Sequence, residues 1–506
     1  MDSPGSKDEI LQSLLQHTHD YNKRSPLYQG LRECRFDLEF PLLLNSRESP
    51  LACRETADQA QAVEAHFSDR IHDFFNALDA FEKLSNTTGN EILVRDVGLW
   101  PSIRITNQSF DRHPDCLHRD FHSRRLSLRD PGTLPQLQRV TKLRIFPRPD
   151  YGADLPFEGA RPVSPQAPLE LAARLPALRE LDCPWMWERM PVAFSSRALR
   201  HYTRPWAGPW RDARREFGAA ARDLSGRLPA SLTAMRLWFW RPSAFCADED
   251  QSAQMPDLVG AASGASSADP VSLGLRALGA QLERLDVRAF LTADLFRAPV
   301  VWPRMRWLAV EFQPWCPDGT WYFVGPRGEN PHPDRGFEVT REEHYPPEGP
   351  DDDAEDREID AEWAERDGNE VEDRATDAFR TEPRRDKVEP LLLGFASALH
   401  EIRTLEEAEL FVWLAWQPSE QRLEEYMDAE EPFNQECAIF RWGVRYVPGT
   451  ADSKGTVTWQ VGAWRPDDEV IRAFESLGGS NGSVDMVWQP FEFLDMRPQE
   501  DLTAFT

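Results

Sequence analysis

A short pattern of apolar residues recurs six times along the chain. Each copy has an apolar residue, two variable residues, a second apolar residue, one variable residue and a third apolar residue. The copies are Val140/Leu143/Ile145, Leu178/Leu181/Cys183, Leu232/Met235/Leu237, Leu282/Leu285/Val287, Met305/Leu308/Val310 and Leu405/Ala408/Leu410. Because side chains of a strand alternate between its two faces, the second and third apolar residues of each copy share one face. The pattern predicts six short strands with one buried face each.

The same spacing is typical of the strand in leucine-rich repeats. Five of the six copies follow a short apolar or proline-containing segment that would carry the chain back to the start of the next strand. A single strand of this kind cannot bury its apolar face, so successive strands are expected to stack. The predicted fold is α/β: an irregular leucine-rich-repeat-like solenoid with parallel strands, long loops and a C-terminal β-hairpin plus helix cap.

The spacing between copies is irregular. The middle residues are separated by 38, 54, 50, 23 and 100 positions, whereas a regular repeat keeps to about 20 to 29 residues. Missed strands or long loops must fill the larger intervals, and residues 197–202 are a candidate for an extra strand. The alternative interpretation is that the pattern arises by chance in leucine-rich amphipathic helices, since short apolar runs are ambiguous.

Other periodicities predict the elements at the two ends. Phe36, Leu38 and Phe40 alternate with acidic residues as in a half-buried strand, and residues 58–84 carry an apolar stripe at helical spacing. Near the C-terminus, residues 437–446 and 456–461 are β-rich runs joined by a turn region, and residues 467–478 follow as a helix. This hairpin and helix would cover the last repeat.

Charge separates one segment from the rest. Residues 351–387 hold 16 acidic and 7 basic residues with few large apolar ones, so residues 326–387 are predicted to be a disordered acidic insert. A milder, Ser/Ala/Gly-rich break at 248–269 predicts a flexible loop. The expected organisation is an N-terminal α/β segment (1–130), irregular leucine-rich repeats (131–325), the acidic insert (326–387) and a last repeat with the hairpin and helix cap (388–506).

Composition narrows the class of protein. The 506 residues are 41% hydrophobic and include 18 tryptophans, which is too apolar for a mainly disordered chain. A formal net charge of -27 disfavours binding to nucleic acid or anionic membranes. The chain shows neither a secretion signal nor an apolar stretch long enough to span a membrane, and its seven cysteines form no CxxC pair. We therefore expect a cytoplasmic or nuclear protein with reduced thiols.

One cluster could carry metal chemistry. Between positions 111 and 122 lie Asp111, His113, Cys116, His118, Asp120 and His122. Four such side chains would bind zinc if they converged, but the spacing matches no structural zinc pattern and is also typical of an exposed polar loop. The sequence contains no nucleophile-elbow, phosphate-loop, dinucleotide-binding or metalloprotease motif. We therefore predict no cofactor and no catalytic residues, with a metal-binding enzyme as the alternative.

Recognition of another protein is the favoured function. If the six copies are strands, the residues that alternate with the buried positions point to the opposite face. The candidates for partner binding are Arg144, Phe146, Arg236, Trp238, Trp240, Arg288, Glu311, Phe411 and Trp413. Tryptophan and arginine are enriched among residues that dominate protein interfaces. In the alternative interpretation, the tryptophans pack beneath the long loops.

Several sequence blocks also resemble a family. They are LYQGLRECRFDLEF, HDFFNALDAF, EILVRDVGLWPS, LERLDVRAFLTADLF, VVWPRMRWLAV, CAIFRWGVRY, VTWQVGAW and VIRAFESL. Together they resemble a group of uncharacterised filamentous-fungal proteins that are F-box-like and leucine-rich-repeat-like, and the resemblance covers most of the chain outside the acidic insert.

The resemblance implies a role in ubiquitin ligation. An N-terminal F-box would bind the adaptor of a cullin-type ubiquitin ligase, and the repeats would hold an as yet unknown protein substrate. About twenty residues precede the first matching block, and they lack the Leu-Pro phrase of an F-box. We therefore expect a repeat-type binding protein whose F-box is missing or lies upstream, or else a degenerate copy that has no partner.

Overall fold

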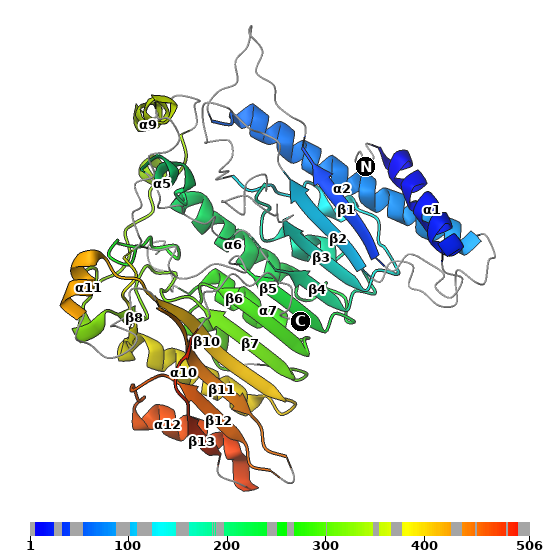
Figure 1. Cartoon of the computed structure of the whole chain (residues 1–506). Helices are drawn as coiled ribbons and strands as arrows, with labels where there is room; N and C mark the ends of the chain where they lie inside the picture. Colours follow the sequence, from blue (N-terminus) through cyan, green and yellow to red (C-terminus); the bar gives the residue numbers. More distant parts are fainter. Residues whose placement is uncertain are drawn as a thin grey trace.

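The computed structural model describes residues 6–24, 33–40, 54–87, 102–108, 124–147, 161–184, 186, 188, 197–239, 250–260, 268–299, 301–347, 354–365, 377–426, 438–450, 453–481 and 484–493. Over these residues the chain is a mixed α/β protein in which helices pack on a mostly parallel central sheet. Figure 1 shows the strands of this sheet side by side, in the colour order of the sequence.

The parallel part of the sheet follows chain order. Its strands are β1 (Glu33–Glu39), β2 (Ser102–Gln108), β3 (Lys142–Pro147), β4 (Glu180–Cys183), β5 (Ala234–Trp238), β6 (Arg284–Ala289), β7 (Trp307–Phe312) and β10 (Glu407–Trp416). Each is parallel to the next strand in this series. Parallel neighbours cannot be joined by a tight turn, so a helix or a longer segment returns the chain between them.

The C-terminal strands continue the same sheet, in which β11 reverses direction and β12 and β13 run with the parallel series again. β11 (Ala438–Val447) is antiparallel to β10 and to β12 (Thr456–Gln460), which confirms the predicted hairpin. β13 (Asp485–Trp488) is parallel to β12, and the short β14 (Glu492–Phe493) pairs with β11. A separate small sheet joins β8 (Phe323–Val324) to β9 (Glu382–Pro383).

Helices lie between many of the successive strands, and several of them pack against the same side of the sheet. The α-helices are α1 (Lys7–Arg24), α2 (Ala57–Thr87), α4 (Ala167–Ala172), α5 (Arg197–Thr203), α6 (Ala207–Leu224), α7 (Pro270–Gly279), α8 (Arg341–His344), α9 (Ala354–Glu365), α10 (Arg385–Glu401), α11 (Glu420–Tyr426) and α12 (Asp468–Glu475). Short 3-10 turns are η1 (Pro131–Thr133), η3 (Ala293–Phe296), η4 (Pro326–Gly328) and η5 (Ser476–Asn481). None of the helices described is both long and apolar enough to cross a bilayer.

Local sequence signals explain where two of these helices begin. At the start of α2, Thr56 and Gln59 exchange hydrogen bonds between side chain and backbone N–H, at 3.1 and 3.3 Å, as in a capping box. At the start of α7, the Asp269 carboxylate accepts a hydrogen bond from the Ser272 backbone N–H at 2.9 Å, and Pro270 occupies the first turn. The predicted helix at 58–84 is confirmed as α2.

The six apolar copies line up across the sheet. The register of neighbouring strands places their middle residues directly beside one another, in the order Leu143, Leu181, Met235, Leu285, Leu308 and Ala408. All six are buried, in one cluster with side chains of α2, α4, α6, α7, α10 and α12. The prediction of neighbouring parallel strands with a shared buried face is therefore confirmed, and the alternative of isolated amphipathic helices is wrong.

The predicted disorder of residues 326–387 is wrong for the part of this segment that the structure describes. Ile359 and Phe379 are fully buried, and α8, α9 and β9 lie within the segment. Arg380 is also buried, and its Nε donates a hydrogen bond to the Gln251 carbonyl oxygen at 2.9 Å. The acidic composition predicted disorder because the segment has few apolar residues. In the structure, buried ion pairs and hydrogen bonds replace the missing apolar contacts.

Two further predictions need correction. Residues 250–260 of the supposed flexible break at 248–269 are packed: Met255 and Leu258 join Trp315 and Trp321 in a second buried cluster at the ends of the strands. Residues 197–202, a candidate extra strand, instead form most of α5. In both segments tertiary contacts override the local composition.

The shared leucine row predicts a large effect of shortening one of its members. We expect Leu285→Ala to lower the free energy of unfolding by about 2–5 kcal/mol, because it removes a fully buried side chain and leaves a cavity. Chemical unfolding followed by tryptophan fluorescence would measure the change. Leu84→Ala, the same substitution at a position that is 43% exposed, should cost less than about 1 kcal/mol. Equal costs would contradict the core assignment.

A half-buried carboxyl group on α4 predicts a pH dependence. Burial, and then the nearby Glu216 carboxylate, raise the pKa of Glu170 to about 7, and its Oε2 atom is buried without a hydrogen-bond partner among the described residues. The folded state thus keeps a proton that the unfolded chain has lost, so this group makes stability fall as pH rises from its ordinary pKa of 4.5 towards about 7.

We therefore expect Glu170→Gln to raise the free energy of unfolding at pH 8 by roughly 1 kcal/mol, after allowance for solvent screening, and to change it little at pH 4.5. Urea unfolding at the two pH values would measure this difference. Glu424→Gln, at an exposed position on α11, serves as the control. A gain of equal size at both pH values would argue against a titrating group.

Candidate interaction surface

The side of the sheet opposite the leucine row carries polar and aromatic residues. Strand register brings them into two rows that cross the sheet. The first row is Arg144, Asp182, Arg236 and Asp286, each directly beside the next. The second row is Trp238, Arg288, Glu311 and Phe411. We call these two rows, together with Trp307 and Arg441 described below, the polar face.

Ion pairs hold the first row together. The Asp182 carboxylate is buried and accepts two hydrogen bonds from Arg236, one from Nε at 2.6 Å and one from Nη2 at 2.8 Å. The Nε atom of Arg144 lies 3.2 Å from the same carboxylate. Both arginine side chains remain partly exposed, so Asp182 fixes two guanidinium groups while leaving part of each accessible.

Trp238 joins the first row to the second. Its indole Nε1–H donates a hydrogen bond of 2.8 Å to the Asp286 carboxylate. The guanidinium carbons of Arg288 and Arg236 lie 4.4 and 5.1 Å from the centre of its ring, within the range of cation–π contacts. Burial raises the pKa of Asp286, while the hydrogen bond from Trp238 and the two arginines oppose that rise. The ring is therefore held rigidly at the centre of the polar face.

The second row ends at Phe411 of β10, beside the antiparallel strand β11. Arg288 donates a hydrogen bond from Nε to the Glu311 carboxylate at 2.8 Å, and burial raises the pKa of Glu311 against the opposing effect of this arginine. Farther along, the guanidinium carbon of Arg441 lies 4.0 Å from the centre of the Phe411 ring. Arg441 also bonds to the Glu409 carboxylate at 2.7 Å. Each aromatic ring in this row thus contacts an arginine.

The predicted contact residues differ in how they are placed. Arg144, Arg236, Trp238, Arg288 and Phe411 lie together on the polar face and are partly exposed. Glu311 lies in the same row but is only 6% exposed, so it supports Arg288 instead of offering a free carboxylate. Trp413 packs against Ala378, Ala415 and Ile439, as expected if a long loop covers it. Trp240 and the Phe146 side chain lie outside the described residues.

Trp307 and Asp182 are among the residues of the polar face that the list of candidates left out. Trp307 is 40% exposed on β7, between Arg284 of β6 and Glu407 of β10 in register, and the Arg306 guanidinium carbon lies 4.8 Å from its ring centre. Asp182 is the acid that pairs with two arginines of the first row. Trp307 directly precedes the buried Leu308, and Asp182 lies between the buried Leu181 and Cys183. Because side chains alternate along a strand, both residues are predicted to face away from the core.

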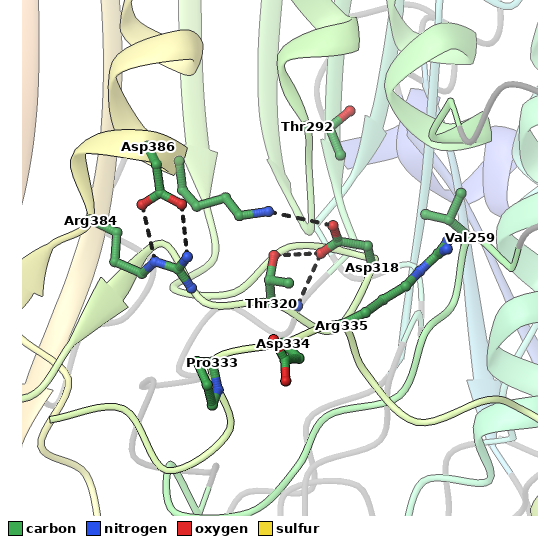
Figure 2. A pocket seen from close by; sticks show the side chains of 10 residues that line it. Val259, Thr292, Asp318, Thr320, Pro333, Asp334, Arg335, Arg384 and Asp386 are labelled. Carbon is green, nitrogen blue, oxygen red and sulfur yellow. Dashed lines mark hydrogen bonds and ion pairs between the residues drawn. The ribbon is translucent and has the colours of Figure 1, made fainter.

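A charged depression lies at the start of α10. Its volume is about 480 Å³, and Figure 2 shows its lining, which includes Asp318, Arg335, Arg384 and Lys387. These charges already pair with neighbours: Lys387 Nζ is 3.7 Å from Asp318, Arg384 Nη2 is 2.7 Å from Asp386, and Arg335 Nε is 2.6 Å from Asp257. The ten residues that line it include neither histidine nor cysteine. Small-molecule sites are mostly apolar, so the depression does not resemble one.

The residues considered for metal binding are not placed. The whole cluster from Asp111 to His122 lies outside the described residues. In the part of the chain that the structure describes, no group of three or more His, Cys, Asp or Glu side chains is arranged to hold a metal ion. Cys183 and Cys316 are buried free thiols, and burial raises the pKa of Cys316 to about 12, which keeps that thiol protonated at neutral pH.

Comparison with known proteins adds nothing to this geometry. No protein-family model matches the chain, and no curated protein matches it either.

Proposed function

We propose that this chain is a protein-interaction module and that its polar face, rather than a catalytic centre, carries its function. The observation behind the proposal is the register of the sheet, which sets Trp238 and its neighbouring arginines from separate stretches of sequence into continuous rows. Rigid aromatic and arginine side chains lose little conformational freedom on binding, and they dominate the energetics of protein interfaces.

The finer features of the proposal concern fold and partner. The strand order and the aligned leucine row support a leucine-rich-repeat-like stack, in which one side of the sheet forms the core and the other meets a partner. The resemblance to F-box-like proteins suggests that this partner is a substrate of a cullin-type ubiquitin ligase. The mixed charge of the rows favours a protein surface that carries both acidic and basic groups.

The proposal predicts that removing an aromatic side chain from the polar face weakens partner binding. We expect Trp307→Ala and Trp238→Ala each to reduce recovery of the main partner, after affinity purification from native cells, by roughly 10-fold to 30-fold, as expected for hot-spot residues. Quantitative mass spectrometry of the purified material would measure this. Recovery of cullin-ligase subunits with the partner would support the ligase role.

The matched control is another exposed tryptophan on the other side of the sheet. Trp488 is 37% exposed and stacks on Trp459, whose ring contacts Phe474 of α12. Trp488→Ala should leave partner recovery unchanged. If all three variants keep their unfolding midpoint and bind alike, or if no partner is enriched reproducibly, the proposed role of the polar face is wrong.

A further inference from the structure

The acidic segment supplies a helix that is seated on a distant part of the chain. α9 lies against α5, and Figure 1 shows the two helices close together beside the sheet. The paired residues are more than 150 positions apart in sequence, as in the contact of His201 with Asp356. This contact is independent of the polar face.

Charge complementarity defines the contact. The Asp356 carboxylate, which is almost completely buried, pairs with Arg54 Nε and with His201 Nε2. Glu355 lies 3.9 Å from both His201 Nδ1 and Arg204 Nη1. Farther along α9, Glu358 and Glu362 lie 3.7 and 3.3 Å from Arg197 of α5. Four cationic or protonatable side chains therefore face one side of an acidic helix, and we call them the basic site.

One apolar residue and one hydroxyl complete the interface. Ile359, a single helical turn after Asp356, is fully buried in the main core cluster. The Tyr202 hydroxyl donates a hydrogen bond to the Asp360 carboxylate. Acids at positions 355, 356, 360 and 362 thus surround the central Ile359. This arrangement requires a helix, because only helical spacing brings these side chains to one side.

The receiving surface also explains why α9 is helical. A 12-residue helix is marginal in water, and this one carries six acidic residues against one basic residue. The basic site neutralises part of that charge and buries Ile359. Contacts with the basic site therefore add to the stability of this helix.

We propose that the basic site binds acidic amphipathic helices of other proteins and that α9 is its intramolecular occupant. A partner helix with the same arrangement of acids around one branched apolar residue would form the same contacts. The outer part of the contact is the weaker part, because Arg197 and Glu358 are both about half exposed or more, and ion pairs between exposed groups are weak and screened by salt. The tethered α9 would therefore compete with a partner helix, which would bind only at a concentration high enough to displace it.

Competition between α9 and a free peptide tests this proposal. The probe is a fluorescently labelled peptide of residues 350–368, and the target is the full chain carrying Ile359→Asp, which should release α9. We expect the peptide to bind this variant at least tenfold more tightly than the unmodified chain, by fluorescence anisotropy. Binding should weaken as salt rises from 0.05 to 0.5 M.

A second variant without a docked α9 is needed in case Ile359→Asp unfolds the protein. In it, residues 354–365 of the full chain are replaced by a Gly/Ser sequence of equal length, and the unfolding midpoint of the remaining protein is checked. Adding Arg197→Glu to either variant should abolish peptide binding, whereas Arg222→Glu, an exposed arginine on α6, should not. Loss of binding with Arg222→Glu as well would indicate a general charge effect and overturn the assignment of the site.

Control ligands test the specificity for a helix. A peptide carrying Ile359→Asp and a scrambled peptide of equal charge should bind at least tenfold more weakly than the probe. Equal binding of the scrambled peptide or of polyglutamate would mean that the surface attracts any polyanion, and it would overturn the proposal. The proposal is also wrong if the probe fails to bind both undocked variants, or binds the unmodified chain as tightly as it binds them.

Discussion

The structure depends on one constraint: a parallel strand with a single apolar face must have a neighbour in the same register. A shift of one residue would turn Leu285 towards the polar side and Asp286 into the core, so burial enforces the alignment seen from Leu143 to Ala408. Helices are needed on only one side, because only that side is apolar. The antiparallel pairing of β11 with β10 ends the parallel series without ending the sheet.

The polar face is a consequence of the same register. Once the leucines align, the residues between them align too, and charges of opposite sign meet across strands without any contact in sequence. Asp182 pairs with arginines of both neighbouring strands, and Asp286 accepts a hydrogen bond from Trp238. Arg288 likewise contacts two strands, through Glu311 and Trp238. Such a surface is already organised, so little ordering would oppose binding of the proposed partner. The seated α9 shows that a second, basic surface of this chain accepts a helix of opposite charge.

Sequence patterns predicted the elements whose period is strong. The six apolar copies, the helix at α2, the strand at β1 and the C-terminal hairpin with its helix all rest on regular alternation or helical spacing. Prediction failed where long-range contacts decide the conformation. The sequence around Asp356 and Ile359 does not predict that these residues contact α5. The seven residues of α5 include too few apolar ones to show a clear helical period. Trp413 and Trp307 illustrate the same limit, because alternation gives the side of the sheet but not what covers it.

The agreement between strand order and chain order bears on how the protein forms during synthesis. Each new parallel strand emerges from the ribosome beside a neighbour that is already present, so the sheet can grow from the N-terminus as translation proceeds. The pair β7 and β10 is the exception, since Trp307 meets Glu407 a hundred residues later. While that interval is being translated, the edge of β7 has no final neighbour, and its unpaired backbone groups could pair with another chain.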